Sequence, residues 1–321
     1  MTDLLQIVNL FPHGKIAVIG DLMLDKYIIG QVERISPEAP IPIVSVRQEL
    51  WALGGAANVA ANISTLDGDA YLLGVLGDDA SGETFFSLAR QKGIDTEGIH
   101  VDAQKTTIQK IRVIGQNQQL LRIDYENTDY IEENISEMFL SQLSKNSKLA
   151  AIIVSDYAKG TISGKLMHEL KLFSKAYNIK LIIDPKPGHK DFYKDIDLVT
   201  PNLKEAQLMS GIVVSSRESL EKCGTKIMEE LSCSVVITTG DKGMSVFQMN
   251  KKPVHISTKA TEVFDVSGAG DTVVATISMA LISGATLTQA AEIANFAAGL
   301  KVRKVGTAPV YLDELKQAIS S

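Results

Sequence analysis

The feature that most constrains the fold is an alternation of short apolar runs with longer amphipathic stretches. The apolar runs, rich in Ile, Val and Leu, lie at Ile16–Ile19, Tyr71–Leu76, Ala150–Val154, Leu181–Ile183 and Val235–Thr238. Runs of this kind are typical of parallel strands that helices cover on both faces. The helical stretches lie at Thr84–Lys92, Gly164–Tyr177, Lys204–Met209, Ser216–Leu231, Ala269–Ser283 and Thr288–Val302. The alternation predicts an α/β fold with a mostly parallel sheet and helices on both faces.

Two segments interrupt this alternation. The first, Tyr27–Gln48, contains a proline-rich stretch followed by an apolar run at Ile43–Val46. The second, Thr106–Asp124, is typical of a hairpin with its turn near Gly115–Asn117. Because Pro and Gly are tolerated mainly at sheet edges and turns, we expect edge strands outside the main sheet. They form either a small β-sheet lid over a cleft, from about 27–48 and 106–124, or two separate surface excursions, and periodicity alone favours neither.

The bulk composition limits the possible partners and location. The 321 residues show no internal repeat and no long linker, so we expect one domain over residues 1–321. A formal net charge of −6 argues against bulk attraction to nucleic acid. Cys223 and Cys233 have neither metal-ligand spacing nor a disulfide framework, which suits a reducing compartment. No basic segment precedes an N-terminal apolar run, and the apolar stretches are too short to cross a bilayer. We therefore expect a cytoplasmic protein with no nucleic-acid or membrane partner.

The strongest chemical signal is the segment Asp265–Thr272, in which Gly268, Ala269, Gly270 and Asp271 open a helix. Small residues let the backbone approach a ligand closely, and the free N–H groups of a helix N-terminus attract an anion. A transferred phosphoryl group needs such an anion hole, and the attacking hydroxyl needs a proton acceptor, for which Asp271 is well placed. The alternative is an ordinary helix cap, in which the Asp offsets the helix dipole.

A second glycine cluster, Gly54 and Gly55, precedes Asn58 and a run of small residues. A polar ligand could approach this backbone, and the Asn58 amide can both donate and accept hydrogen bonds. A tight turn before a buried helix explains the same residues equally well. At the end of the first strand, Asp21 follows Gly20, in the region where ligands of open α/β sheets bind. Its carboxylate could accept hydrogen bonds from sugar hydroxyls, although turn capping is the simpler interpretation of Asp21 alone.

Two further motifs also follow apolar runs. Asn202 and Glu205 follow Leu198–Thr200 and lie three apart, on one face of a starting helix. They suit the orientation of the water shell of Mg²⁺ and also fit a helix capping box, and the two roles are compatible. The segment Thr239–Gly243 is typical of a turn into a hairpin. Its backbone N–H groups, together with Lys242, could hold nucleotide phosphates.

Several polar and cationic side chains fall on the expected hairpin and on one loop: Lys110, Arg112, Gln118, Gln119, Arg122 and Lys186. Two or three converging cations would suit a substrate that already carries a phosphate. The alternative is a set of solvated edge-strand charges that suppress aggregation. The sequence contains no G-x-x-x-x-G-K-[ST] loop, and no G-x-G-x-x-G turn follows the first strand, which disfavours a dinucleotide enzyme.

Together these motifs resemble the ribokinase / phosphofructokinase-B family of carbohydrate kinases, in order and along nearly the whole chain. Gly54–Gly55 is similar to the family's N-terminal signature, and Asp265–Thr272 is similar to its C-terminal signature. Within the family, the chain most resembles kinases of D-glycero-β-D-manno-heptose 7-phosphate. The segments that carry this likeness are Gly20–Tyr27, Glu33–Pro40, Asn117–Arg122, Ser155–Gly160 and Asp184–Lys186.

The resemblance implies a fold, a reaction and a role for each candidate residue. The fold is a Rossmann-like, ribokinase-like α/β sheet with a β-lid. The reaction is transfer of the ATP γ-phosphoryl group to the anomeric hydroxyl, giving the 1,7-bisphosphate for ADP-heptose and lipopolysaccharide inner-core synthesis. The implied base is Asp271, with Gly268, Ala269 and Gly270 as the anion hole. The implied sugar contacts are Asp21, Gly54, Gly55 and Asn58, with Lys110, Arg112, Gln118, Lys159 and Lys186 as further candidates for the sugar and its 7-phosphate. Asn202 and Glu205 would serve the water shell of Mg²⁺, and the nucleotide side would comprise Asn202, Thr239, Gly240, Lys242, Gly243 and Asn295.

The resemblance also implies a homodimer that assembles through the β-lids, and it leaves open a monovalent cation near Asp265. In many bacteria the kinase is fused to an adenylyltransferase domain with an H-x-G-H motif. That motif is absent here, so we expect the stand-alone kinase form. Two alternatives stay open: another family sugar kinase, fructokinase-like or ribokinase-like, and a non-catalytic sugar-nucleotide-binding protein. A neutral sugar would need no converging Lys and Arg, and a non-catalytic protein would have lost the base or the anion hole.

Overall fold

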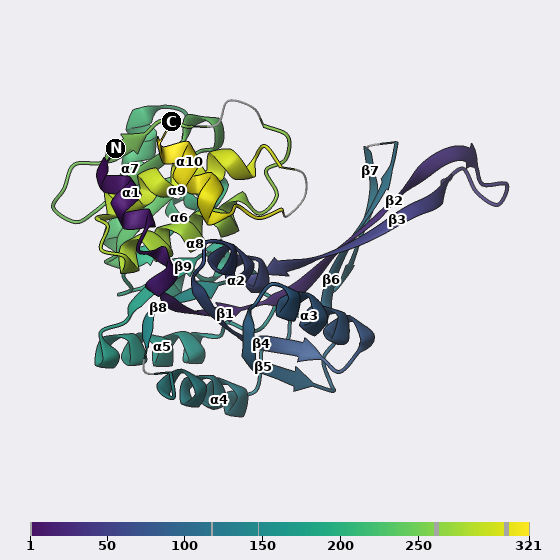
Figure 1. Cartoon of the computed structure of the whole chain (residues 1–321), viewed down its shortest axis with the longest axis horizontal. Helices are drawn as coiled ribbons and strands as arrows, with labels where there is room; N and C mark the ends of the chain where they lie inside the picture. Colours follow the sequence, from purple (N-terminus) through teal and green to yellow (C-terminus); the bar gives the residue numbers. More distant parts are fainter. Residues whose placement is uncertain (1, 117, 147, 260–262, 305–307, 321) are drawn as a thin grey trace.

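The computed structural model describes residues 2–116, 118–146, 148–259, 263–304 and 308–320, and these residues form two sheets. The central sheet has the strand order β13-β12-β11-β10-β9-β8-β1-β4-β5, and the second sheet has the order β3-β2-β6-β7. Helices surround the central sheet, whereas the second sheet projects to one side of it (Figure 1).

The elements of the central unit have the following bounds. The strands are β1 (Lys15–Gly20), β4 (Asp69–Gly77), β5 (Asp95–Asp102), β8 (Leu149–Ser155), β9 (Lys180–Asp184), β10 (Leu198–Val199), β11 (Ser234–Thr238), β12 (Met244–Phe247) and β13 (Val254–Ile256). The α-helices are α1 (Thr2–Val8), α2 (Ala56–Thr65), α3 (Ala80–Gln91), α4 (Glu133–Ser144), α5 (Gly164–Tyr177), α6 (Leu203–Ser210), α7 (Arg217–Leu231), α8 (Ala269–Ile282), α9 (Leu287–Lys301) and α10 (Leu312–Ser320). Three short 3₁₀ helices are η1 (Phe11–His13), η2 (Pro187–Tyr193) and η3 (Gly240–Lys242).

Successive side chains of the central strands point to opposite faces of the sheet and form two hydrophobic cores, one on each face. In β1, Ile16 and Val18 belong to one core, whereas Ala17 and Ile19 belong to the other. Residues of α2, α8 and α9 close the first core, and residues of α4, α5 and α7 close the second. Burial of an aliphatic side chain stabilises the folded state by about 1.5–3 kcal/mol, and these strands bury such side chains on both faces. The strands therefore appear in the sequence as nearly continuous apolar runs.

The predicted fold class is confirmed. Strands β11, β10, β9, β8, β1, β4 and β5 pair in parallel, and only β12 and β13 add antiparallel pairs among the described strands of this sheet. Several elements, among them α1, β5, α4, β13 and α10, have no counterpart in the sequence prediction. β5 is an edge strand in which Asp95, Glu97, His100 and Asp102 interrupt the apolar pattern, so it lacks the run that marks a buried strand.

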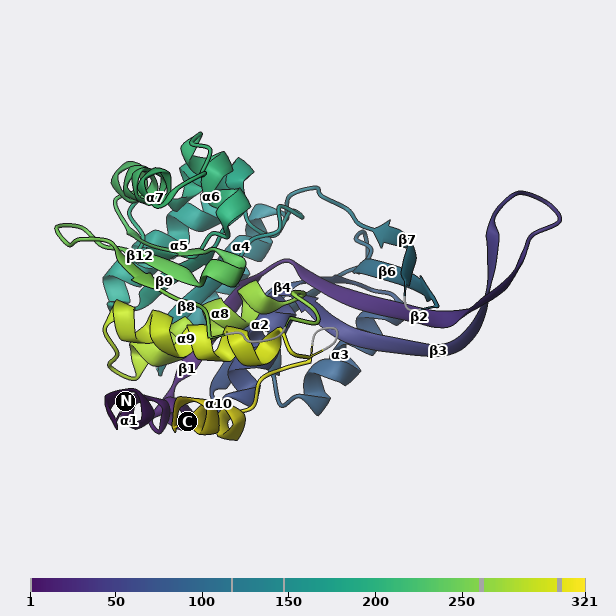
Figure 2. The same cartoon turned by 90° about the horizontal axis from the view of Figure 1, so that it is seen from above.

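The second sheet is built from β2 (Leu22–Ile35), β3 (Pro42–Gly55), β6 (Ile108–Gly115) and β7 (Gln118–Tyr125). β2 pairs antiparallel with β3 and parallel with β6, and β6 and β7 form a hairpin. The outer ends of β2 and β3 extend beyond the rest of the molecule (Figure 2). Our expectation of edge strands is wrong for β2 and β6, which lie inside the sheet. Pro42, which lacks a backbone N–H, starts β3 at an edge, as its chemistry requires.

The parallel strands bring four polar residues to one edge of the central sheet. Asp21 follows β1, Asp156 follows β8, Asp184 ends β9, and Thr239 follows β11. Ligands of open α/β sheets bind beyond the carboxyl ends of the strands. This edge is therefore the place to look for a functional site.

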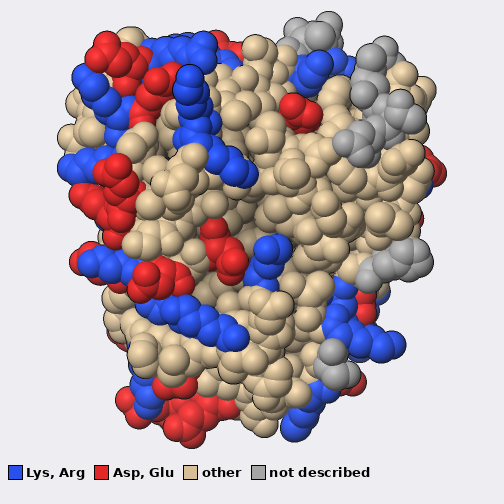
Figure 3. Space-filling view, turned by 90° about the vertical axis from the view of Figure 1, so that its left-hand side faces the viewer, with Lys and Arg blue, Asp and Glu red and all other residues tan. Residues whose placement is uncertain are grey.

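The surface mixes charges of both signs. On the face shown in Figure 3, Lys and Arg side chains are interspersed with Asp and Glu side chains. None of the helices in the described ranges is both long enough and apolar enough to cross a membrane.

Candidate active site

Asp271 lies in the first turn of α8, at the centre of a buried polar cluster. The Asn58 amide donates to its Oδ2 at 2.5 Å, and the Tyr157 hydroxyl donates to its Oδ1 at 2.9 Å. Burial raises the pKa of Asp271 to about 6; the two hydrogen bonds oppose this effect, the Asp25 charge adds to it, and Lys110 opposes it. A carboxylate with this pKa is ionised at neutral pH and can still accept a proton from a hydroxyl.

Gly268, Ala269 and Gly270 form the turn that opens α8 beside Asp271. Gly268 has φ 73°, in the left-handed region, and a Cβ atom on it would lie 2.8 Å from Asn58 Nδ2. A side chain here would therefore strain the backbone and push on the amide that holds Asp271. A Cβ atom on Gly270 would meet no other atom within 4 Å. The N-terminus of this 14-residue helix is thus open to an anion.

Gly54 and Gly55 make the backbone turn from β3 into α2. Gly55 has φ 56°, and a Cβ atom on it would lie 2.3 Å from the carbonyl oxygen of Asp21. A Cβ atom on Gly54 would lie 2.8 Å from Asp25 Oδ2, so this glycine leaves room for the Asp25 carboxylate. Close packing therefore requires both glycines, whether or not they also touch a sugar. The turn places Asn58 in the first turn of α2, where its amide reaches Asp271.

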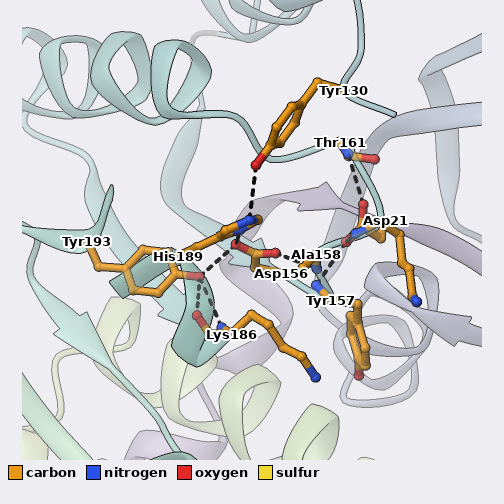
Figure 4. Close-up of polar contacts among 10 residues, drawn as sticks. Asp21, Tyr130, Asp156, Tyr157, Ala158, Thr161, Lys186, His189 and Tyr193 are labelled. Atoms are coloured by element: carbon orange, nitrogen blue, oxygen red, sulfur yellow. Dashed lines mark hydrogen bonds and ion pairs between the residues drawn. The ribbon is translucent and has the colours of Figure 1, made fainter. Parts of the chain in front are cut away.

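Asp21 requires a correction, because its carboxylate is directed into the protein. The residue is fully buried and accepts hydrogen bonds from the backbone N–H groups of Tyr157 (2.9 Å), Lys159 (3.0 Å) and Thr161 (3.0 Å). Figure 4 shows the loop of residues 156–161 folded over this carboxylate. Asp21 therefore shapes the loop that carries Tyr157, instead of contacting sugar hydroxyls as expected.

Asp25 is the acidic residue of this region to which we assigned no role from the sequence. It is 6% exposed, and its Oδ1 accepts a hydrogen bond from Arg112 at 2.5 Å. Its charge is one of the influences that raise the pKa of Asp271. The available signal was an aspartate directly after the apolar run Leu22–Leu24, four residues after Asp21.

One face of the second sheet carries Asp25 and its neighbours. The strand register places Asp25 beside Lys110 and Tyr27 beside Arg112. Because paired residues share a face and side chains alternate along a strand, these four side chains lie on the same face. The pKa of Tyr27 is raised by burial first, then by Asp25, and in part by Asp265. The polar face is therefore turned toward the loop that leads into α8.

Lys110 lies between this face and the Asp271 cluster. Its Nζ is 5.3 Å from the centre of the Tyr157 ring. Burial lowers the pKa of Lys110; Asp25 opposes this effect, whereas Arg112 and Arg122 add to it. Like charges that depress each other's protonation favour a bound anion, which would relieve the repulsion.

A cavity of about 200 Å³ lies on the other side of Asp271. It is lined by Asp156, Tyr157, Asp184, Pro185, Lys186, Thr200, Asn202, Glu205, Thr238, Gly268, Gly270 and Asp271. Asn202 and Glu205 form the expected capping box of α6, with Glu205 N donating to Asn202 Oδ1 at 3.0 Å and Asn202 N donating to Glu205 Oε2 at 2.9 Å. Burial raises the pKa of Glu205 and of Asp184, and the charges of Asp271 and Glu205 add to the effect at Asp184.

A bound cation would relieve this concentration of carboxylates. In the part of the chain that the structure describes, no group of three His, Cys, Asp or Glu residues is arranged to hold a metal directly. An amide and a carboxylate on the wall suit Mg²⁺, which usually keeps several waters. Lys186 lies in the same cavity, and its charge lowers the pKa of both Asp184 and Glu205. Its surroundings therefore differ from the cationic face of the second sheet, where a 7-phosphate contact was expected.

A second cavity, of about 350 Å³, shares Thr238 and Gly270 with the first. Its other lining residues are Gly240, Asp241, Gly243, Met244, Thr258, Val263, Val266, Ala269, Val273, Asn295, Ala298, Gly299 and Val302. Asn295 Nδ2 donates to the carbonyl oxygen of Ser257 at 2.6 Å, and Thr239 Oγ1 donates to that of Gly243 at 2.9 Å. The mostly apolar walls suit a flat heteroaromatic ring. Lys242 is exposed on η3.

The comparison with known proteins decides the family. Residues 13–314 match the pfkB family of carbohydrate kinases. The chain belongs to this family. It is 40% identical over 311 residues to the Bifunctional protein HldE of Desulfatibacillum aliphaticivorans, covering 96% of this chain and 64% of that protein. It is 41% identical over 307 residues to the Bifunctional protein HldE of Geobacter sulfurreducens, covering 94% of this chain and 63% of that protein. The chain thus spans less than two thirds of the length of these relatives.

A solved structure agrees with this assignment at the level of the fold. The Arabidopsis thaliana ribokinase, solved with ribose and ATP, superposes with a TM-score of 0.78 at 20% identity, covering 96% of this chain and 99% of that one. Family membership makes this pfkB kinase an ATP-dependent sugar kinase.

Two expected sugar contacts of this pfkB kinase lie apart from the cluster or are already paired. Lys159 Nζ forms an ion pair with Glu126 at 2.6 Å. Gln118 pairs with Gly115 at the far end of the β6–β7 hairpin, five residues along β6 from Lys110. Five residues span about 16 Å in a strand, so Gln118 does not converge with Lys110 within one chain.

Proposed function

We propose that this pfkB kinase transfers the γ-phosphoryl group of ATP to the anomeric hydroxyl of D-glycero-β-D-manno-heptose 7-phosphate. The observation that carries the proposal is the position of Asp271, between the cationic face of the second sheet and the cavity beside the start of α8. A sugar on that face would present a hydroxyl to Asp271 while the phosphates lie opposite, and such alignment accounts for much of phosphoryl-transfer catalysis. The resemblance of Gly20–Tyr27 and Ser155–Gly160 to heptose kinases supports this sugar.

The two cavities suggest how ATP would lie. The adenine ring would occupy the apolar cavity, and the phosphates would pass Gly270 into the cavity lined by Lys186, Asn202 and Glu205. The N-terminus of α8 would hold the charge of the transferred phosphoryl group. Asp271 would take the hydroxyl proton as the new O–P bond forms and the bond to ADP breaks. When bound between Asn202 and Glu205 through its waters, Mg²⁺ would neutralise phosphate oxygens.

The cationic face supports a phosphorylated sugar over a neutral one. Lys110 and Arg112 are both partly buried and lie side by side, with Asp25 as the nearest counter-charge. Holding two cations so close favours a dianionic ligand. In this account, Asp25 accepts hydrogen bonds from sugar hydroxyls, and the two cations hold the 7-phosphate.

A substrate comparison tests the proposal. The protein would be incubated with ATP, Mg²⁺ and either heptose 7-phosphate, unphosphorylated heptose, fructose or ribose, with ADP release and ³¹P spectra as readouts. We expect a 1,7-bisphosphate, and kcat/KM about 100-fold higher for heptose 7-phosphate than for the unphosphorylated heptose, because two charge-assisted contacts are lost. Faster turnover of ribose or fructose would instead identify a neutral-sugar kinase. ATP binding without turnover of any sugar would identify a non-catalytic protein.

A matched pair of variants locates the sugar phosphate. Arg112→Met should raise KM for the phosphorylated sugar about tenfold or more and leave KM for ATP within about twofold. The control is Arg34→Met, an exposed arginine at the outer end of β2, which should change neither constant. Equal effects of the two variants on the sugar KM would place the phosphate elsewhere.

We also propose a homodimer that forms through the second sheets. On β7, Leu121 and Ile123 are 54% and 38% exposed and lie on the same face of the strand. Among the described strands, β7 lies at the edge of this sheet and has β6 as its one neighbour. An exposed apolar edge strand favours association with another chain.

A further inference from the structure

A buried network behind Asp271 joins residues from two different strand ends. Tyr193 ends η2 and is fully buried. Its hydroxyl accepts a hydrogen bond from the backbone N–H of Lys186 at 3.0 Å and donates to Asp156 Oδ2 at 2.6 Å. His189 Nδ1 lies 2.7 Å from the same Asp156 oxygen, and Tyr130 closes the outer end of the network on His189 Nε2 at 3.2 Å (Figure 4).

Asp156 also shapes the loop that carries Tyr157. Its Oδ1 accepts a hydrogen bond from Ala158 N at 2.8 Å. Ala158 has φ 54°, a left-handed conformation that is uncommon for a residue with a side chain, so this bond stabilises a strained turn. Asp21 holds the same loop from the other side through the Tyr157 N–H. The loop therefore lies between two buried carboxylates, and Tyr157 reaches Asp271 from it.

We propose that Tyr193 is a positioning residue that fixes Lys186 relative to Tyr157 and, through Tyr157, to Asp271. Lys186 and Tyr157 both line the cavity beside Asp271. Figure 4 shows their side chains extending in the same direction, away from Tyr130. The hydrogen bonds run from the Lys186 backbone through the Tyr193 hydroxyl to Asp156, and from Asp156 to the Tyr157 loop. These hydrogen bonds thereby fix the position of Lys186, on the phosphate side, relative to Asp271, on the sugar side.

The inference rests on the proposed phosphoryl transfer and adds a residue to it. Replacing Tyr193 by Phe would keep the ring and leave the Lys186 N–H without this partner. A displacement of about 1 Å in a group that contacts the transferred phosphoryl group can lower the rate about 100-fold. A hydroxyl that only stabilised the fold would lower the melting temperature and leave kcat of the folded enzyme unchanged.

Steady-state kinetics of four variants provide the test, on whichever sugar the wild type turns over. Tyr193→Phe should lower kcat about tenfold or more and leave KM for the sugar within about twofold, because the second sheet is untouched. Lys186→Met should lower kcat as well. In the Lys186→Met background, Tyr193→Phe should change kcat by less than about twofold, because its effect acts through Lys186. The matched control is Tyr130→Phe, which removes a hydroxyl at the outer end of the same network and should leave kcat within about twofold.

Three results would overturn the proposal: normal kcat in Tyr193→Phe, additive effects of Tyr193→Phe and Lys186→Met, or an equal loss in Tyr130→Phe. If Tyr193→Phe does not fold, Asp156→Asn replaces it and should show the same loss of kcat at an unchanged KM for the sugar. If neither variant folds, the network is purely structural and the proposal is overturned. The proposed function fails differently, because the wild type itself would then not turn over heptose 7-phosphate. In that case, the ratio of kcat between Tyr193→Phe and the wild type, measured on another sugar that the wild type turns over, still decides the role of Tyr193.

Discussion

At the scale of single residues, the chemistry depends on how Asp271 is held. Asn58 and Tyr157 each donate one hydrogen bond to its carboxylate, and burial opposes its ionised form. The two effects leave a group that is charged at neutral pH but easily protonated. A base with this balance can take the proton of a sugar hydroxyl and release it after transfer.

Removing the Tyr157 hydroxyl should move the acidic limb of the kcat–pH profile to higher pH. The hydroxyl donates to the ionised form of Asp271 and so lowers its pKa; without it, the pKa rises above about 6. The base acts when ionised, so activity is lost as pH falls through that pKa, and in Tyr157→Phe the loss begins earlier on acidification. The measurement is kcat from about pH 5 to pH 9. An unchanged limb would mean that the profile does not report Asp271.

Asp21→Asn should destabilise the protein, because two backbone N–H groups converge on one oxygen of the Asp21 carboxylate. Whichever way the amide is turned, it loses the charge that three N–H groups share, and we expect the free energy of unfolding to fall by about 3 kcal/mol. Denaturant unfolding measures this change. The control Asp191→Asn alters an exposed residue and should stay within about 0.5 kcal/mol. Equal effects would show that Asp21 does not hold the loop.

The sequence identified some of these residues and not others, for a physical reason. Asp271 and Asn58 each follow glycines at the start of a helix, so local pattern marks them. The hydrogen bond from Tyr157 to Asp271 spans 114 positions and exists only because β8 ends and α8 begins at the same edge of the sheet. Asp25 lies within β2, and no neighbouring glycine, proline or helix start marks it in the sequence. The sequence marked Asp21 as a candidate sugar contact, but the backbone groups that donate to it lie in a loop that only the fold brings near.

At the scale of elements, the start of α8 is the most constrained turn. Gly268→Ala should lower both stability and kcat, the latter about tenfold or more, because the added methyl group strains the backbone and displaces the Asn58 amide. Gly284→Ala is a matched control: it also has a left-handed glycine, at φ 89°, but nothing lies within 4 Å of the added atom. Gly284→Ala should therefore lower stability and leave kcat unchanged. The same loss of kcat in both variants would show that the contact with Asn58 is unimportant.

Elements with two buried faces, or with one clear apolar stripe, could be predicted from the sequence. The runs at β1, β4, β8, β9 and β11 are apolar because helices cover them on both sides, and α5 starts and ends where its pattern does. The start of β2, at residues 22–26, was missed because only Asp21 separates this strand from β1 and no turn signal marks the boundary. α4 follows a polar segment and buries only Ile135, Ser136, Phe139 and Leu143, so its stripe is short.

At the scale of the whole molecule, the second sheet has one polar face and one with exposed apolar side chains. If the apolar side chains of β7 bury against a second chain, Ile123→Lys should shift the protein toward monomer in sedimentation or light scattering, because a buried unpaired charge is costly. Leu172→Lys, on α5, changes an exposed apolar residue away from this sheet and should have no effect on the mass. An unchanged mass for Ile123→Lys would remove β7 from the interface.

The candidate site depends on the whole chain, because its residues come from distant segments: Asp25 from β2, Asn58 from α2, Tyr157 from the loop after β8, and Asp271 from α8. Sequence pattern could predict that such residues exist and that strand ends converge. It could not predict which carboxylate faces a ligand and which faces a backbone loop, as Asp25 and Asp21 show. That distinction depends on the direction of one side chain at the junction of two sheets.

The most direct test of the central claim is the turnover of Asp271→Asn with saturating ATP, Mg²⁺ and sugar. The amide keeps the size of the side chain and one of the two oxygens that accept from Asn58 and Tyr157, but it cannot accept the proton. We therefore expect kcat to fall about 100-fold or more while the dissociation constant for ATP stays within about threefold. Turnover close to that of the wild type would contradict the assignment of Asp271 as the catalytic base.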